Sequence, residues 1–309
     1  MGKFFDRMVN GDPNKKNFTR RDLPKNRLEL FADVVKTRLL GLMTVNLLYV
    51  MFLVPIIIIF MWTYFGIEQR IAAIGAGMGV KTLWEQEIIP YFMSAYLLCI
   101  PFYTLAGPAK AGLHYVVRTW SWGEHATAGA DFWKEFKRSW KPAMLYNFLT
   151  AIAIYAVAFW VMMLWGSNGI TELLRFVGVV VIGILALIFL LMSVYVYPLM
   201  VTYKLKFKQL LKNSMIFGLM QMISTFVVLI CIALVFVLFA LTWQIATVLM
   251  LTFGFAFICL GKTIYCGSIF DKYHQYLTND PYQMRRGMAP YQTEDASEPE
   301  EAQESAEEK

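Results

Sequence analysis

Charge is scarce in this chain and is missing altogether from five long stretches. Lys, Arg, Asp and Glu make up 16% of the 309 residues, and the mean hydropathy is +0.51. Soluble domains contain about 25% charged residues. A helix needs about 20 apolar residues to cross the hydrocarbon core of a bilayer, and every charge-free stretch is longer than that. This absence predicts an integral membrane protein. The stretches are 39–67, 88–109, 142–171, 176–203 and 213–261.

The last of these stretches is too long for a single crossing. As one helix it would extend roughly 73 Å, against a hydrocarbon core of about 30 Å. We expect it to fold back near Thr242, Trp243 and Gln244. The predicted fold is therefore an all-α polytopic membrane bundle of about six transmembrane helices. Its predicted parts are a basic segment 1–38, a membrane domain 39–265, and a tail 266–309 that is disordered and acidic from about residue 294, rich in Asp and Glu.

Sequence motifs for catalysis and for metal binding are also missing. The chain has no H-E-x-x-H, no G-x-S-x-G, no P-loop and no G-x-G-x-x-G. Its three histidines, His114, His125 and His274, are scattered without the spacing of metal ligands. Its four cysteines form no C-x-x-C pair and are interpreted as packing residues. We therefore expect no enzyme, no metal site and no cofactor.

No ionisable residue lies within the charge-free stretches. Proton-coupled transporters, pumps and voltage sensors usually carry such residues inside the membrane, because they perform the coupling. Polar residues such as Asn46 and Asn147 do occur there, and we interpret them as helix–helix hydrogen-bonding groups. This pattern argues against a proton-driven carrier and leaves a pathway for a neutral solute open.

Lys and Arg are distributed very unevenly between the two predicted sides of the membrane. Of the 28 basic residues, 25 fall in the N-terminal segment, in residues 110–141 and 204–212, and in the tail. The positive-inside rule then places both termini of this multi-pass protein in the cytoplasm. No cleavable signal peptide is visible, so the first span is expected to direct insertion. The net charge of +6 is explained by contact with anionic lipids, without any nucleic-acid partner.

Two of the predicted cytoplasmic loops are both basic and aromatic. Residues 132–144 read FWKEFKRSWKPAM and residues 203–215 read YKLKFKQLLKNSM, which suggests an internal repeat at an offset of 71. Each copy is predicted to form an amphipathic helix at the inner surface. Such a helix serves either as a lipid anchor or as a docking site for a partner. The candidate residues are Glu124, Phe132, Phe136, Lys137, Arg138, Trp140, Lys141, Pro142, Phe207, Lys208 and Lys212.

One detail of the first loop favours docking. Permeases of ATP-driven importers have a cytoplasmic coupling loop of the form E-A-A-x(3)-G-A, followed later by Phe and Pro. Glu124, Ala126, Phe136 and Pro142 fall at similar offsets, whereas Gly129 and Ala130 come one position early. The loop is also more basic than the permease pattern.

Small residues at the inner end of the second span predict close helix packing. Gly107 and Ala111, with Pro108 between them, form a small-x-x-x-small pair. Such a pair lets the backbone of another helix approach.

Several short motifs resemble the YesL-like family, bacterial integral membrane proteins of unknown function. They are the opening MGKFFDRMVNGDP, Asn46-Leu47-Leu48 followed by Pro55, the stretch IPFYTLAGPAKAGLHYVVR at 100–118, Asp131-Phe132 to Lys141, and Tyr197-Pro198 followed by Lys212-Asn213. The first two span motifs are about 45 residues apart here, farther than is usual in the family, and Pro108 replaces a small residue. The resemblance implies a genetic context of carbohydrate ATP-driven (ABC) importers and glycan-degrading enzymes, and it implies no catalytic residues.

Two functions remain from these observations. The first is a non-catalytic accessory membrane subunit of a carbohydrate ABC importer, with membrane lipids and the ABC permease and ATPase subunits as its partners. The second is a permease-like transporter subunit for a neutral solute. A membrane enzyme is disfavoured because no acid–base or metal cluster is present.

Overall fold

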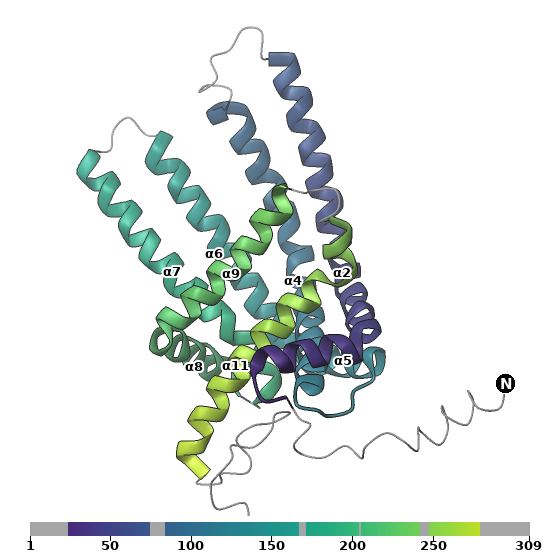
Figure 1. The fold of residues 1–309 in the computed structure, drawn as a ribbon. Coiled ribbons are helices and arrows are strands. Elements are labelled where there is room, and N and C mark those ends of the chain that lie inside the picture. Colours follow the sequence, from purple (N-terminus) through teal and green to yellow (C-terminus); the bar gives the residue numbers. More distant parts are fainter. Residues whose placement is uncertain (1–23, 75–83, 167–170, 204, 242–246, 279–309) are drawn as a thin grey trace, which may run out of the picture.

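The computed structural model describes residues 24–74, 84–166, 171–203, 205–241 and 247–278 (Figure 1). These residues form helices and contain no strand, which confirms the predicted all-α class. The opening motif, the fold-back at residues 242–244 and the acidic tail lie outside the described residues. The elements in chain order are α2 (Arg27–Ile74), η2 (Trp84–Ile88), α4 (Ile89–Ser121), α5 (Ala128–Arg138), α6 (Trp140–Gly166), α7 (Glu172–Thr202), α8 (Phe207–Met220), α9 (Met222–Leu241), η3 (Met250–Gly254) and α11 (Phe255–Thr278).

Five helices are long and apolar enough to cross a membrane, and α8 with α9 provides a sixth candidate. The five are α2, η2 with α4, α6, α7, and η3 with α11. The α8–α9 pair is bent by 93° at Gln221, so that α8 turns away from the direction of α9. The chain is therefore a multi-pass membrane protein whose helix count agrees with the predicted number of about six.

The first helix changes direction before it enters the bundle. Arg38 has φ −124° and ψ 23°, which interrupts the helical geometry inside α2. In Figure 1 the purple N-terminal part of α2 lies across the lower end of the bundle, and the rest of α2 runs up through it. We call the end that carries this segment, α5 and α8 the basic end.

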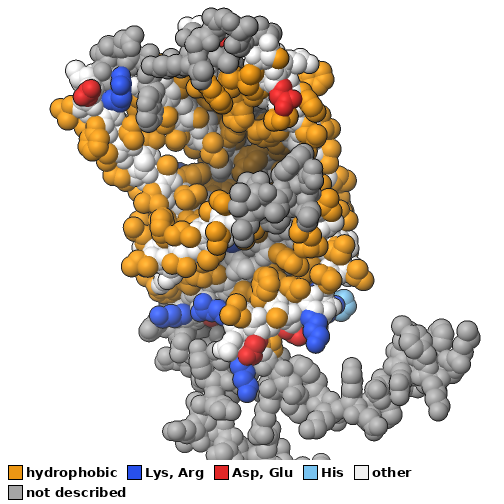
Figure 2. All heavy atoms as spheres, turned by 45° about the horizontal axis from the view of Figure 1, so that its top comes forward, with side chains coloured by type: hydrophobic (Ala, Val, Ile, Leu, Met, Phe, Trp, Pro, Cys, Tyr) orange, Lys and Arg blue, Asp and Glu red, His pale blue; other side chains and the backbone are white. Residues whose placement is uncertain are grey.

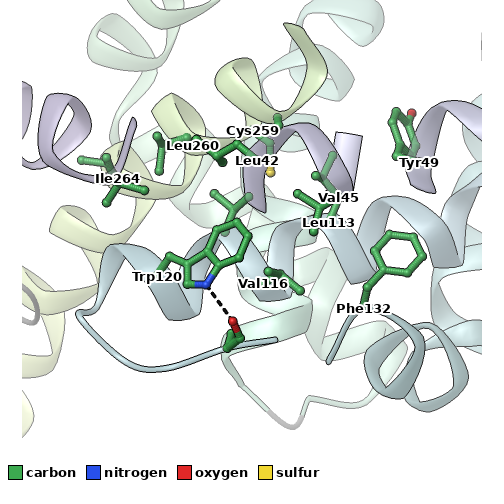
Figure 3. Close-up of a cluster of buried hydrophobic side chains, with 14 of the residues drawn as sticks. Leu42, Val45, Tyr49, Leu113, Val116, Trp120, Phe132, Cys259, Leu260 and Ile264 are labelled. Atoms are coloured by element: carbon green, nitrogen blue, oxygen red, sulfur yellow. Dashed lines mark hydrogen bonds between the residues drawn. The ribbon is translucent and has the colours of Figure 1, made fainter. Parts of the chain in front are cut away.

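The central helix of the bundle is α4, which packs against α2, α5, α6, α7 and α11. Two clusters of buried side chains flank it. One joins α4 to α2, α5 and α11 around Trp120 and Phe132 (Figure 3). The other joins α6, α7, α8 and α11 around Tyr195 and Tyr197. A core on both sides fixes α4 from its middle to its C-terminal end.

The outer surface of the bundle is apolar between two charged ends. Figure 2 shows a band of hydrophobic side chains, with Lys and Arg gathered mainly at the end below it. Large exposed residues such as Trp62, Trp160 and Ile223 contribute to this surface. Such an apolar band matches the acyl region of a bilayer, and soluble monomers rarely expose an apolar surface of this extent.

The helices α4 and α11 both continue well past the lysine that ends their charge-free stretches. The charge-free stretches end before Lys110 and Lys262, but α4 continues to Ser121 and α11 to Thr278, beyond the expected boundary at residue 265. Ionisable side chains therefore occur within the spanning helices, which corrects the expectation that the spans carry none. The reason is that a charge ends an apolar run in the sequence without ending a helix, since backbone hydrogen bonding continues through it.

Candidate functional site

Helix α5 is held against the bundle by one buried aromatic side chain. Phe132 is 0% exposed and packs in the cluster around Trp120. Gly112 of α4 permits this approach, because a Cβ atom there would lie 2.8 Å from the carbonyl oxygen of Phe132. The preceding loop is fixed as well, since Trp120 Nε1 donates a hydrogen bond of 3.0 Å to the carbonyl of Ala126 (Figure 3).

The two predicted aromatic contacts of α5 face inward to different extents. Phe136 is half-buried, and its ring centroid lies 5.2 Å from that of Phe52 in α2. Together with Phe132 it attaches α5 to α2 and α4. The structure therefore uses these two predicted interaction residues for packing within the chain, where a separate partner or lipid reaches them least.

A second set of loop residues faces outward. Trp140 is 48% exposed and Trp133 is 36% exposed. Lys137 and Lys141 are exposed beside them, and so is Arg138. We call these five residues the docking surface. Of the predicted candidates outside it, Glu124 is exposed in the preceding loop and Pro142 is half-buried in the first turn of α6.

A buried carboxylate closes the C-terminal end of α5. Glu135 is 1% exposed and pairs with Arg138, with 2.9 Å between Arg138 Nε and Glu135 Oε2. Ser139, at the break before α6, donates a hydrogen bond to the same carboxylate. Burial raises the pKa of the Glu135 carboxyl, whereas the Ser139 hydroxyl and the Arg138 guanidinium act in the opposite direction.

The second basic loop forms α8, whose surroundings differ from those of α5. Phe207 is half-buried, and Lys208 and Lys212 are exposed. Leu210 is buried, and Gly218 approaches the backbone of α7 at Leu191. Helix α8 begins at Phe207, whereas Phe136, the residue aligned with Phe207 in the first loop, lies near the end of α5. The two copies therefore share residues but not local structure, which speaks against a structural repeat at an offset of 71.

The small residues of α4 lie at its contact with α6. A Cβ atom at Gly107 would be 2.5 Å from the carbonyl oxygen of Ala143. Pro108 and Ala111 are buried on the same helix. Asn147 of α6 donates a hydrogen bond of 2.8 Å to the carbonyl of Tyr103, one turn before Gly107. These contacts bring the α4 and α6 backbones together at one point.

Comparison with known families finds a similarity that includes this same region. Residues 42–162 match the family described as "Protein of unknown function, DUF624", which comprises YesL-like bacterial membrane proteins. Over these residues, which make up less than half of the chain, the sequence is similar to that family. No curated protein and no solved structure matches the chain.

The region matched to the YesL-like family contains Asn46, one of the polar residues singled out in the first span. Its side chain is fully buried and bonds to the start of the last span: Nδ2 donates to the carbonyls of Met250 and Leu251, at 3.2 and 2.8 Å, and Oδ1 accepts from the N–H of Ala256 at 2.9 Å. These groups belong to the π-helical turn η3 and its exit, where the regular backbone pairing is interrupted. Asn46 therefore acts as a helix–helix hydrogen-bonding group.

A polar group inside the bundle was missed by the sequence reasoning. It consists of Lys110 and His114 of α4, Tyr197 of α7, and Lys262 and Thr263 of α11, and we call it the interior cluster. Lys110 Nζ lies 4.7 Å from the centroid of the Tyr197 ring. The ring of His114 stacks on Tyr197 at 5.5 Å, and its Nδ1 lies 3.4 Å from Thr263 Oγ1.

One signal in the sequence could have revealed part of this cluster. Lys110 and His114 are four residues apart, so they share a face if the second span continues past residue 109. A span that ends at its first charge excludes this shared face, because Lys110 would then lie outside the second span. The described residues contain no group of three or more His, Cys, Asp or Glu side chains that could hold a metal ion.

Proposed function

We propose that the protein is a non-catalytic accessory subunit of a carbohydrate ABC importer, and that the docking surface contacts the importer. The observation that carries this proposal is a rigidly held helix with exposed Trp and basic residues. Phe132 and Phe136 fix α5 on the bundle, while Trp140 and Trp133, whose ring also touches Phe52, stay partly exposed. Trp and Arg are enriched where interfaces derive most of their binding energy.

Rigidity supports a docking role for this surface. A helix that is already anchored by Phe132 and Phe136 loses little conformational entropy when a partner binds. The five exposed groups of the docking surface, which are two indoles, two ammonium groups and one guanidinium, allow both apolar burial and pairing with acidic residues of a partner. The choice of a carbohydrate importer as the partner rests on the genetic context that the family resemblance implies.

We also propose that the basic end faces the cytoplasm of a bacterial plasma membrane. Of the 28 Lys and Arg residues, 25 belong to segments assigned to that side. Short loops with such an excess of Lys and Arg remain on the cytoplasmic side during insertion. The docking surface would then face the side on which the ATPase subunit of an importer works.

The alternative is a permease-like subunit for a neutral solute. The likeness of residues 124–142 to a coupling loop supports it, as does the number of spans. The interior cluster supports it less, because two lysines and a histidine lining the bundle suit an anionic ligand better than a neutral one. Uptake of sugar by vesicles that contain this protein alone would favour the alternative.

Copurification in mild detergent tests the accessory role. The full-length protein should bring down an ABC permease and an ATPase from native membranes, and Trp133→Ala with Trp140→Ala should reduce their yield by roughly tenfold or more, as expected for two interface aromatics. The control is Trp62→Ala with Trp160→Ala, two exposed tryptophans on the apolar band. Phe136→Ala is a poorer probe, because the Phe136 side chain is half-buried against Phe52, whereas Trp133, which also contacts Phe52 with 6.0 Å between ring centroids, is 36% exposed.

The outcomes separate docking from lipid anchoring. Loss of both importer subunits in the Trp133/Trp140 variant alone, at unchanged melting temperature, supports docking. If the variant retains every wild-type partner, or if the wild type brings down no importer subunit, the accessory role is rejected and the surface is a lipid anchor.

A further inference from the structure

The interior cluster places positive charge where the structure supplies no negative charge. Lys110 and Lys262 lie close enough to repel each other, and His114 lies within range of both. Within the described residues no carboxylate is in ion-pair distance of any of the three. Charged groups inside a helix bundle are costly unless they are paired. An anion bound beside the two ammonium groups would offset this cost.

The lysines also keep accessible surface inside the bundle. Both side chains are surrounded by protein, from α4 and α11 and from the Tyr197 ring of α7, yet neither is fully buried by its neighbours. No hydrogen bond from either ammonium group is found among the described residues. Each therefore has three N–H donors free for a ligand.

A tyrosine beside the cluster provides an independent observation. The hydroxyl of Tyr146 in α6 is buried and has no hydrogen-bond partner. Its ring packs edge-on against Tyr197, with 5.6 Å between centroids. Tyr197 itself is oriented by its hydroxyl, which donates to Asn147 Oδ1. Buried hydroxyl groups are seldom left unpaired, so this one, on a ring that packs against the ring over which Lys110 lies, indicates that a hydrogen-bonding partner is missing near the cluster.

The position of the cluster across the membrane indicates which chemical group binds there. Lys110 lies about half a helical turn from Gly112, the residue against which α5 packs. The cluster is thus close to the basic end, near the level of lipid headgroups. Basic sites between transmembrane helices at this level take phosphate groups.

We propose that Lys110 and Lys262 bind a phosphate group inside the bundle, between α4 and α11. Their ammonium groups neutralise the phosphate charge. His114, positioned by Thr263 and by stacking on Tyr197, borders the site. The phosphate belongs either to the headgroup of an anionic lipid or to a soluble phosphate compound, because both present the same oxygens.

Thermal unfolding of the delipidated full-length protein in neutral detergent tests this site. One titration uses phosphatidylglycerol, with phosphatidylcholine as its control. A second uses inorganic phosphate, with sodium chloride of equal ionic strength as its control, since salt screens charge without occupying the site. The melting temperature should rise saturably in at least one titration. A response to phosphatidylglycerol alone identifies a lipid headgroup, and a response to inorganic phosphate identifies a soluble ligand.

Variants of the lysines connect this response to the site. Lys110→Met and Lys262→Met should each weaken binding about tenfold or more, because each removes one charged hydrogen-bonding partner. Lys36→Met with Lys272→Met, which changes two exposed lysines on α2 and α11, should leave the response intact. An unchanged response in Lys110→Met and Lys262→Met overturns the proposal, as does the lack of any saturable response in the wild type.

A second measurement tests the site even if the methionine variants fail to fold. Native mass spectrometry of the wild type should show one saturable phosphatidylglycerol or phosphate adduct. Lys110→Arg, which keeps the charge, should retain that adduct. If the wild type carries no such adduct, the site is rejected, and the two lysines are then neutral packing residues.

Discussion

At the scale of single residues, the contact between α4 and α6 depends on the absence of a side chain. Gly107 faces the carbonyl of Ala143, and Asn147 binds the Tyr103 carbonyl one turn away. Helices in a bilayer gain little from burying apolar surface against each other, since lipid is apolar as well. Close backbone packing and interhelical hydrogen bonds therefore determine this contact.

We predict that Gly107→Ala lowers the stability of the protein in detergent, and that Gly107→Leu lowers it further. The new Cβ atom would lie 2.5 Å from the Ala143 oxygen, so the helices must separate. Overpacking of this kind costs about 1–3 kcal/mol. The melting temperature of the purified protein measures the effect. Gly183→Ala in α7 is the control, because nothing lies within 4 Å of a Cβ atom there. Equal melting temperatures for Gly107→Leu and the wild type would refute the contact.

At the scale of elements, the sequence predicts that α5 is an amphipathic helix, but it does not predict what its aromatic face contacts. The spacing of Phe132 and Phe136 indicates a helix with one aromatic face. The structure buries that face and leaves Trp133 and Trp140 outside. The pattern alone does not distinguish a face that meets lipid from one that meets another part of the same chain, because both environments are apolar.

The end of α5 provides a pH-dependent prediction. Because burial raises the pKa of Glu135, the folded state binds this proton more tightly than the unfolded state does. The resulting stabilisation is complete below the ordinary value of 4.5 and is lost as pH rises through the raised pKa. Glu135→Gln resembles the protonated form. We therefore expect its melting temperature to match that of the wild type near pH 4.5 and to exceed it near pH 8.

Thermal unfolding of both proteins across this pH range measures the difference. The control is Glu124→Gln, which changes an exposed carboxylate in the preceding loop. A Glu135→Gln protein that is less stable than the wild type near pH 8 would show instead that the ion pair with Arg138 outweighs the cost of burial.

At the scale of the whole molecule, the basic end and the apolar band define an orientation in the membrane. α5, α8 and the first turns of α2 lie at one end, while α7 begins at the other (Figure 1). Charged residues at both ends and an apolar surface between them fix the depth of the bundle (Figure 2).

We predict that the basic end is cytoplasmic, with Lys212 and Glu172 on opposite sides of the membrane. Both residues are exposed, in α8 and at the start of α7 respectively. Single cysteines at these positions should react with an impermeant maleimide from opposite sides, Lys212→Cys in everted vesicles and Glu172→Cys in right-side-out vesicles. The background should lack Cys231, the one exposed native cysteine among the described residues. Labelling of both positions from the same side would contradict the topology.

The sequence by itself determined the membrane class, the approximate number of spans and the position of the basic segments. These properties follow from hydrophobic length and local charge, which each segment carries independently of its neighbours. It also indicated the small residues of α4 and the polar Asn46 and Asn147, whose types suit helix contacts wherever the partner helix lies.

Only the tertiary structure decided which residues face each other. Thr263 and His114 meet although 149 positions separate them, and Lys110 and Lys262 share one interior space with Tyr197. The structure also decided that Phe132 lies inside the bundle, whereas Trp140 lies outside it. The rotation and crossing of helices far apart in the chain set these contacts. A charge that ends an apolar run in the sequence therefore becomes, in the fold, the centre of an interior cluster.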